Sequence, residues 1–147
     1  MDVVLSSDAA FFWPMFAMVV LTAIVWVRMY LVRVAEMKEK RIAPQKVSLS
    51  GQAAALLENT NAADNFRNLF EVPVLFYAIC LMLMMSGSES LLLLGMAWLF
   101  VTLRAIHSLI HLTHNTVLQR FKVYIGGTVV LYAMWVVAAV EFAAQSN

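Results

Sequence analysis

Four long apolar segments alternate with shorter polar ones along the chain. A helix that crosses the hydrocarbon core of a bilayer needs about 20 mainly apolar residues. The apolar segments have this length and predict helices over about residues 9–33, 60–86, 90–113 and 120–144. The stretches between them leave no room for a soluble domain. We therefore expect a single all-α domain over residues 1–147, built as a bundle of four transmembrane helices.

The polar connections support this division. The second and third predicted helices are separated only by Ser86-Gly87-Ser88-Glu89, whose glycine and serines suit a tight turn between antiparallel helices. The longer connections are predicted over about residues 34–59 and 113–120. No basic residue precedes the first apolar segment, and no small-residue cleavage site follows it. We expect this segment to remain as a membrane helix, because a removed signal peptide normally carries both features.

The amino-acid composition narrows the class of protein further. Of the 147 residues, 63% are hydrophobic and 13% are charged, whereas soluble domains average about 25% charged residues. This shortage of charge excludes a soluble globule, a disordered chain and a basic nucleic-acid-binding protein, so we expect membrane lipids and no nucleic acid as partners. The single cysteine, Cys80, lies within an apolar segment and predicts a buried, inert thiol.

The basic residues predict the orientation in the membrane. All ten lie in two windows, Arg28 to Arg67 and Arg104 to Lys122, and none lies in the termini or the Ser86 turn. Loops rich in lysine and arginine remain on the cytoplasmic side. We therefore expect both longer connections to be cytoplasmic and both termini to lie on the non-cytoplasmic side.

The second predicted helix contains polar residues that orientation does not explain. Asp64, Asn68 and Glu71 follow at spacings of four and three, which predicts a shared face, and Arg67 is placed to pair with Glu71 one turn later. Pro73 favours a kink beside Glu71, because it lacks a backbone donor. Ionisable groups within membrane helices indicate function by default. The structural alternative is a buried Arg67–Glu71 pair that only locks helices together.

The third and fourth predicted helices carry a second polar group. Arg104, His107 and His111 follow at spacings of three and four, and they form one stripe. Arg120 and Tyr124 lie four apart, near the start of the fourth helix. These groups meet at the same predicted membrane depth. Their convergence indicates a site for a polar, anionic ligand that enters from the cytoplasm.

A metal or haem site is the alternative reading of the histidines. His107 and His111 have a spacing that can hold one metal ion, and His114 could add a third imidazole. The residues between the first two, however, include no glutamate, and no cysteine lies nearby. We expect no metal ion here.

Two motifs carry a resemblance to a known family. The segment Arg67-Asn68-Leu69-Phe70-Glu71, followed by Pro73, is similar to the RNxxE segment that enters helix two in that family. The second motif is Arg104-x-x-His107, with Arg120 sixteen residues after the first arginine. Over nearly its whole length the chain resembles a bacterial-type member of the MAPEG superfamily, the membrane-associated proteins in eicosanoid and glutathione metabolism.

This resemblance implies a fold and an activity. The family fold is a left-handed four-helix bundle that assembles as a homotrimer, with glutathione bound between neighbouring subunits near the cytoplasmic face. The implied activity is that of a glutathione-dependent transferase or peroxidase. Glutathione would be the cosubstrate, and the second substrate would be a lipophilic electrophile or lipid hydroperoxide that arrives from the bilayer. The implied location is a bacterial inner membrane.

The resemblance also implies site residues. Those that would hold the tripeptide are Arg67, Asn68, Glu71, His107 and Tyr124, and the polar stripe adds Arg104 and His111 as candidate binding residues. Arg120 would lie beside the sulfur as the catalytic residue, because a guanidinium favours the thiolate. An arginine late in the first helix also takes part in the family. Arg33 is the nearest candidate here, and Arg28 is the alternative.

Two positions depart from the family pattern. Asp64 stands where the well-studied eicosanoid enzymes have an arginine, and His111 replaces a tyrosine. Both departures favour a second hypothesis, a non-catalytic membrane protein of the same fold that binds a lipid head group or serves as an accessory subunit. The set of Arg104, His107, Arg120 and Tyr124 favours the enzyme.

Overall fold

The computed structural model describes residues 10–145, and these residues form helices and connections without strands. The helices, in chain order, are α1 (Phe12–Glu39), a 3₁₀-helix (Pro44–Val47), α2 (Ser50–Leu56), α3 (Asn61–Asn68), α4 (Pro73–Met85), α5 (Leu91–Leu112) and α6 (Val117–Gln145).

Four helical segments are long and apolar enough to cross a membrane. They are Phe12–Glu39, Asn61–Met85, Leu91–Leu112 and Val117–Ala144. The prediction of an all-α membrane protein with four helices of this kind is thereby confirmed. The predicted first residue of the first helix, residue 9, lies outside the described part of the chain, as do both termini.

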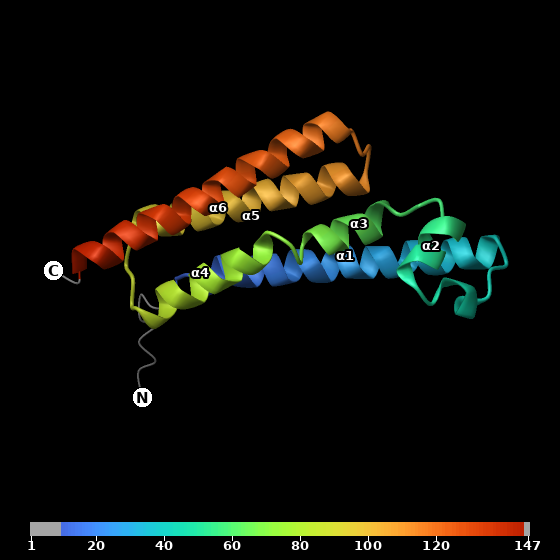
Figure 1. The fold of residues 1–147 in the computed structure, drawn as a ribbon, viewed down its shortest axis with the longest axis horizontal. Coiled ribbons are helices and arrows are strands. Elements are labelled where there is room, and N and C mark those ends of the chain that lie inside the picture. Colours follow the sequence, from blue (N-terminus) through green and yellow to red (C-terminus); the bar gives the residue numbers. More distant parts are fainter. Residues whose placement is uncertain (1–9, 146–147) are drawn as a thin grey trace.

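The helices form two antiparallel layers along one long axis (Figure 1). α5 and α6 lie side by side as one pair, while α3 and α4 follow each other along α1. The short α4–α5 turn lies at one end of the molecule, and α2 and the α5–α6 connection lie at the other. We call the latter the basic end, because Lys40, Arg41 and Lys46 lie in the connection after α1, and Arg120 lies in the first turn of α6.

The first helix is longer than predicted, because α1 continues to Glu39 rather than ending near residue 33. The added turns are rich in helix-forming residues, and Lys40 Nζ lies 2.8 Å from Glu36 Oε1 one turn earlier. The Glu36 carboxylate also accepts the backbone N–H groups of Glu58 at 2.7 Å and Asn59 at 3.2 Å. The hydrogen bond to Glu36, and to a smaller extent the one to Glu58, raises the pKa of Lys40 above its usual value. This cluster ties the start of α3 to the end of α1.

The second predicted helix is broken into α3 and α4, with residues 69–72 between them. Pro73 is the first residue of α4, where its missing N–H costs no helical hydrogen bond. Because of this break, Arg67 and Glu71 do not occupy one continuous helix, and the predicted ion pair between them is wrong. Arg67 Nη1 instead lies 3.7 Å from Asp64 Oδ1.

The apolar core joins the two layers below the basic end. The rings of Phe76 on α4 and Phe100 on α5 are stacked with their centroids 4.6 Å apart. Cys80 is fully buried in the same core, as predicted. The core therefore holds α4 against α5, and this arrangement places the polar stripe of α5 opposite the end of α3.

Candidate functional site

A buried polar cluster lies on α5 near the basic end. Arg104, His107 and His111 are 1%, 2% and 1% exposed. They occupy the predicted stripe and are enclosed by residues of α3 and α6. Buried polar groups are costly unless they are hydrogen-bonded, so the partners of each side chain indicate what the cluster can do.

Arg104 is held by the break between α3 and α4. Its Nη2 donates to the backbone oxygen of Asn68 at 2.8 Å. Asn68 is the last residue of α3, so its carbonyl lacks a partner within the helix and is free to accept from another group. The guanidinium also lies over the Tyr124 ring, 5.4 Å from the centroid. Its Nε and Nη1 have no hydrogen-bond partner among the described residues.

His107 connects α5 to the first turns of α6. Its Nδ1 lies 3.1 Å from the backbone oxygen of Arg120 and must carry the proton, because a carbonyl only accepts. The other ring nitrogen, Nε2, is buried and has no partner within residues 10–145. The ring centroids of His107 and Tyr124 are 5.7 Å apart. The cluster therefore combines unused donors on Arg104 with an unused ring nitrogen on His107.

Arg120 is held by two uncharged groups. Its Nη1 donates to Asn115 Oδ1 at 2.6 Å and to His111 Nε2 at 3.1 Å. Arginine has no acceptor, so His111 presents the lone pair. No ion pair joins Arg120 to a carboxylate in the described chain. The side chain is thus fixed in place while its positive charge is not neutralised.

Sequence reasoning did not assign a role to Asn115. This residue has a φ of 46°, in the left-handed region that asparagine tolerates better than most residues. Its side-chain nitrogen donates to Asn61 Oδ1 at 2.8 Å, which joins the α5–α6 connection to the start of α3. A second missed contact joins Ser108 Oγ to Asn65 Oδ1 at 3.2 Å. The only sequence signal for the contact made by Asn115 was an asparagine in a short connection.

A small recess opens beside these side chains. It has a volume of about 200 Å³ and is lined by Asn68, His107, Val117, Arg120, Phe121 and Tyr124. Sites for small molecules usually occupy about 300–1,000 Å³. One chain therefore supplies only part of a site for a ligand as large as a tripeptide.

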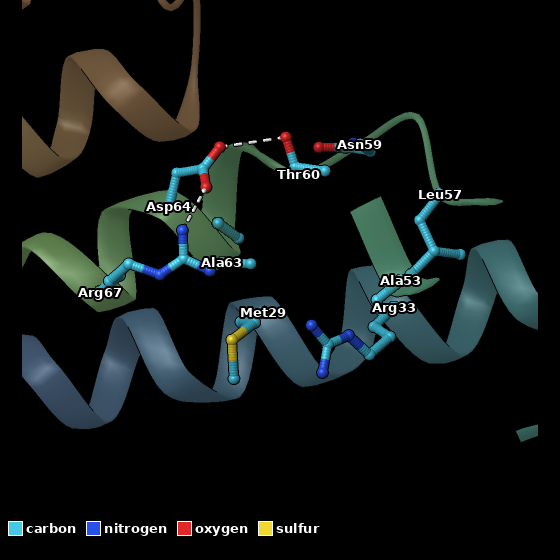
Figure 2. Close-up of a pocket in the computed structure, with 10 residues that line it drawn as sticks. Met29, Arg33, Ala53, Leu57, Asn59, Thr60, Ala63, Asp64 and Arg67 are labelled. Carbon is cyan, nitrogen blue, oxygen red and sulfur yellow. Dashed lines mark hydrogen bonds and ion pairs between the residues drawn. The ribbon is translucent and has the colours of Figure 1, made fainter. Parts of the chain in front are cut away.

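The other predicted site residues lie elsewhere. Arg33, Asp64 and Arg67 line a separate pocket of about 260 Å³ between α1, α2 and α3 (Figure 2), and it shares no lining residue with the recess. Arg28 lines neither hollow, so Arg33 is the arginine of α1 that faces this pocket. Glu71 is exposed in the break, and it lies near enough to interact electrostatically with Arg104.

The predicted shared face of Asp64, Asn68 and Glu71 does not become one site. Asp64 lines the pocket beside α1, Asn68 lines the recess, and Glu71 lines neither. The reason is the early end of α3, which separates Glu71 from the helical register of the other two.

The histidines lie in a cationic setting. Among residues 10–145, no group of three or more His, Cys, Asp or Glu side chains is placed to hold a metal ion. The ring centroids of His107 and His111 are 5.7 Å apart. His111 Nε2 lies 3.1 Å from Arg120 Nη1, and His107 lies near enough to Arg104 to interact with its charge. These arginines favour an anionic group over a metal cation.

A bundle with four membrane-length helices and a buried cationic cluster at one end defines a multi-pass integral membrane protein. The model of the MAPEG family matches residues 11–140, and the chain belongs to this family. No significant match was found among curated proteins or among solved structures. The family includes glutathione-dependent transferases and peroxidases as well as non-catalytic members.

Proposed function

We propose that this protein is a glutathione-dependent transferase or peroxidase that acts on lipophilic electrophiles or lipid hydroperoxides in the membrane. The observation that carries this proposal is the fixed but unneutralised guanidinium of Arg120 at the edge of the recess. Membership of the MAPEG family supports glutathione as the cosubstrate.

The proposed role of Arg120 follows from the chemistry of a thiol. A thiol with a pKa of about 8.5 is mostly protonated at neutral pH. A nearby positive charge stabilises the thiolate, which is the nucleophile. In the transfer reaction the sulfur electron pair forms a bond to an electrophilic carbon, and the leaving group departs with the electrons of the broken bond. Arg120 is suited to this role because Asn115 and His111 hold it without offsetting its charge.

The remaining contacts of glutathione are proposed for the neighbouring side chains. His107, Tyr124 and Asn68 line the recess, and the guanidinium of Arg104, with two unused donors, lies over the Tyr124 ring. Glu71, exposed at the break, is the proposed partner of the ammonium group. Arg33 and Arg67 line the separate pocket, and we leave them out of this proposed site.

The recess in one chain is too small for the whole tripeptide. We therefore propose that a neighbouring subunit completes the site in a homotrimer, as the family resemblance implies. We further propose that the basic end faces the cytoplasm of a bacterium whose inner membrane holds the protein, because lysine and arginine concentrate on that side.

Substitution of Arg120 tests the proposed function. Arg120→Ala should lower turnover by about 10²–10³-fold, a loss typical of removing one group that stabilises developing or reactive charge. Glutathione affinity, measured by calorimetric titration in detergent, should fall much less, because the charge acts mainly on the sulfur. Arg120→Lys should rescue poorly, since the lysine stem does not place its ammonium where Arg120 Nη1 donates to both Asn115 and His111.

The decisive measurement is the thiolate absorbance of bound glutathione as pH is varied. Arg120→Ala should move its appearance to higher pH, and an S-blocked analogue should give no signal. Lys122→Ala is the matched control, because Lys122 is an exposed basic residue two positions later on α6. Equal titrations and equal turnover in the parent and Arg120→Ala would overturn the proposal.

A non-catalytic function is the second candidate. The observation that favours it is Asp64, which stands where the eicosanoid enzymes have an arginine. Its carboxylate lies 3.7 Å from Arg67 and offsets the charge of that residue. In this case glutathione would produce no binding heat in the parent protein, and every Arg120 variant would behave alike.

A further inference from the structure

The connection after α1 turns back along that helix instead of continuing away from the bundle. Arg41 has a φ of 52°, in the left-handed region, and the N–H of Ile42 donates to the Met37 carbonyl at 2.9 Å. A left-handed residue with this hydrogen bond caps a helix and redirects the chain. The 3₁₀-helix and α2 follow, and Ala53 of α2 lines the same pocket as Met29 of α1. α2 therefore lies beside α1, well before the end of that helix (Figure 1).

The aromatic residues of α1 indicate the membrane depth of α2. Trp13 and Tyr30 are 57% and 58% exposed, and tryptophan and tyrosine concentrate at the two interfaces of a bilayer. At 1.5 Å per residue, their separation of 17 positions spans about 26 Å, close to the roughly 30 Å thickness of a hydrocarbon core. Tyr30 thus marks the level of the head groups. Because Met29 adjoins Tyr30, α2 lies at this level as well.

Two leucines of α2 are exposed at this depth. Leu49, which precedes the first turn, is 65% exposed, and Leu56, the last residue of the helix, is 40% exposed. They are seven positions apart, nearly two turns, so they lie on one side of the helix. Ala53 and Leu57 are only 4% and 6% exposed and line the pocket. The helix therefore packs one apolar side against the protein and leaves a second apolar strip uncovered.

The same segment carries positive charge that nothing offsets. Arg41 and Lys46 are exposed, and neither forms an ion pair among residues 10–145. No acidic residue occurs from Arg41 to Leu57. Apolar side chains beside basic ones are typical of a segment that lies in the membrane interface. The charge is complementary to an anionic lipid surface.

We propose that residues 41–57, the surface segment, lie on the bilayer at the basic end and bind anionic lipids. Leu49 and Leu56 insert at the boundary between head groups and acyl chains, and the side chains of Arg41 and Lys46 contact lipid phosphates. The depth of α2 favours lipid over a soluble protein as the partner, because lipid surrounds the chain at the level of Tyr30. This surface is separate from the recess, and the proposal does not depend on the use of glutathione.

Spin labels on single cysteines test the depth of the surface segment. In a Cys80→Ala background, Leu49→Cys and Leu56→Cys each carry a nitroxide in vesicles of phosphatidylcholine and phosphatidylglycerol. Oxygen concentrates in the bilayer and a nickel chelate remains in water, so the relaxation that each causes reports the depth of the label. Both positions should respond mainly to oxygen. The two variants are independent, so the measurement does not depend on either one folding.

Gly51→Cys is the matched control for position. It lies two residues after Leu49 and so on the opposite side of the helix. A side chain fits there, because an added Cβ would have no atom within 4 Å. A label at this position should respond mainly to the nickel chelate.

A charge substitution tests the choice of lipid. With the label at position 49, Lys46→Gln should lower the ratio of inserted to water-exposed forms by about fivefold, the effect of one basic residue near an anionic surface. Vesicles of phosphatidylcholine alone should lower this ratio without any charge substitution. Lys122→Gln is the control, because it removes the same charge from α6 instead of the surface segment. Its ratio should match that of the labelled parent.

Three outcomes would overturn the proposal. Equal access of the nickel chelate to positions 49 and 51 would place α2 in water. An unchanged ratio in the absence of phosphatidylglycerol would show that the basic residues do not select anionic lipid. Shielding of positions 49 and 56 from both oxygen and the nickel chelate would show that a second copy of the chain covers the leucines.

Discussion

The surroundings of Arg104 indicate whether this residue serves the stability of the bundle or the binding of a ligand. It is 1% exposed, and one of its nitrogens donates to the Asn68 carbonyl while two have no partner in the described chain. A buried donor without a partner costs about 1–3 kcal/mol. An arginine that served only to hold helices together would be better replaced by an apolar side chain. Its unused donors therefore point to a ligand.

This reasoning predicts the effect of Arg104→Met. The free energy of unfolding should stay equal or rise by about 1–3 kcal/mol, because methionine fills a similar volume and leaves no unpaired donor. Glutathione affinity should fall. Thermal melting in detergent and calorimetric titration measure the two effects separately. A lower melting temperature with unchanged affinity would instead identify Arg104 as a structural residue.

At the scale of the elements, the extension of α1 positions α3, which contributes residues to both the pocket and the recess. Glu36 is the central contact, because its carboxylate accepts from Lys40 Nζ and from the backbone of Glu58 and Asn59. The pKa of Lys40 is raised by this contact, so its contribution to stability is complete at neutral pH and is lost only as pH rises past 10.5 towards the raised value. The contact therefore persists under physiological conditions.

Glu36→Gln should loosen the connection between α1 and α3. We expect unfolding stability to fall by about 1–3 kcal/mol, because charge-assisted hydrogen bonds are weakened. Tryptic cleavage at Arg41 and Lys46 should become faster. Glu39→Gln is the control, since Glu39 is an exposed carboxylate on the same helix without an ion pair in the described chain. Equal cleavage of both variants would contradict the role given to Glu36.

At the scale of the whole molecule, the basic end and the α4–α5 turn lie at opposite ends of the bundle. In a bilayer they must therefore face opposite sides. The distribution of lysine and arginine predicts that the basic end is cytoplasmic.

Cysteine labelling checks this orientation. In a Cys80→Ala background, single cysteines at Lys40 and at Ser88 should react with an impermeant thiol reagent from opposite sides of the membrane. In intact cells the Ser88 position should react from outside, and the Lys40 position only after permeabilisation. The background variant without added cysteines is the control. Reaction of the Lys40 position in intact cells would reverse the proposed topology.

The number of membrane-length helices, the basic end and the family were all readable from the sequence. The physical reason is that a bilayer offers no hydrogen-bond partners, so each crossing satisfies its backbone within one helix, and its apolar length appears directly in the chain. The stripe of Arg104, His107 and His111 was also readable, because helical spacing places these residues on one face. The missing backbone donor of proline predicted a kink beside Glu71, and the structure has a break at residues 69–72 there.

Only the tertiary structure decided which polar groups meet. The sequence predicted an Arg67–Glu71 pair, whereas the end of α3 at Asn68 leaves Arg67 beside Asp64. Within one chain, packing of α1 against α3 puts Arg33 and Arg67 in a pocket apart from the recess beside His107. The contact of Asn115 with Arg120 depends on one left-handed residue. Such contacts depend on where a helix ends and how helices rotate against each other, and helical periodicity along one chain segment does not determine either.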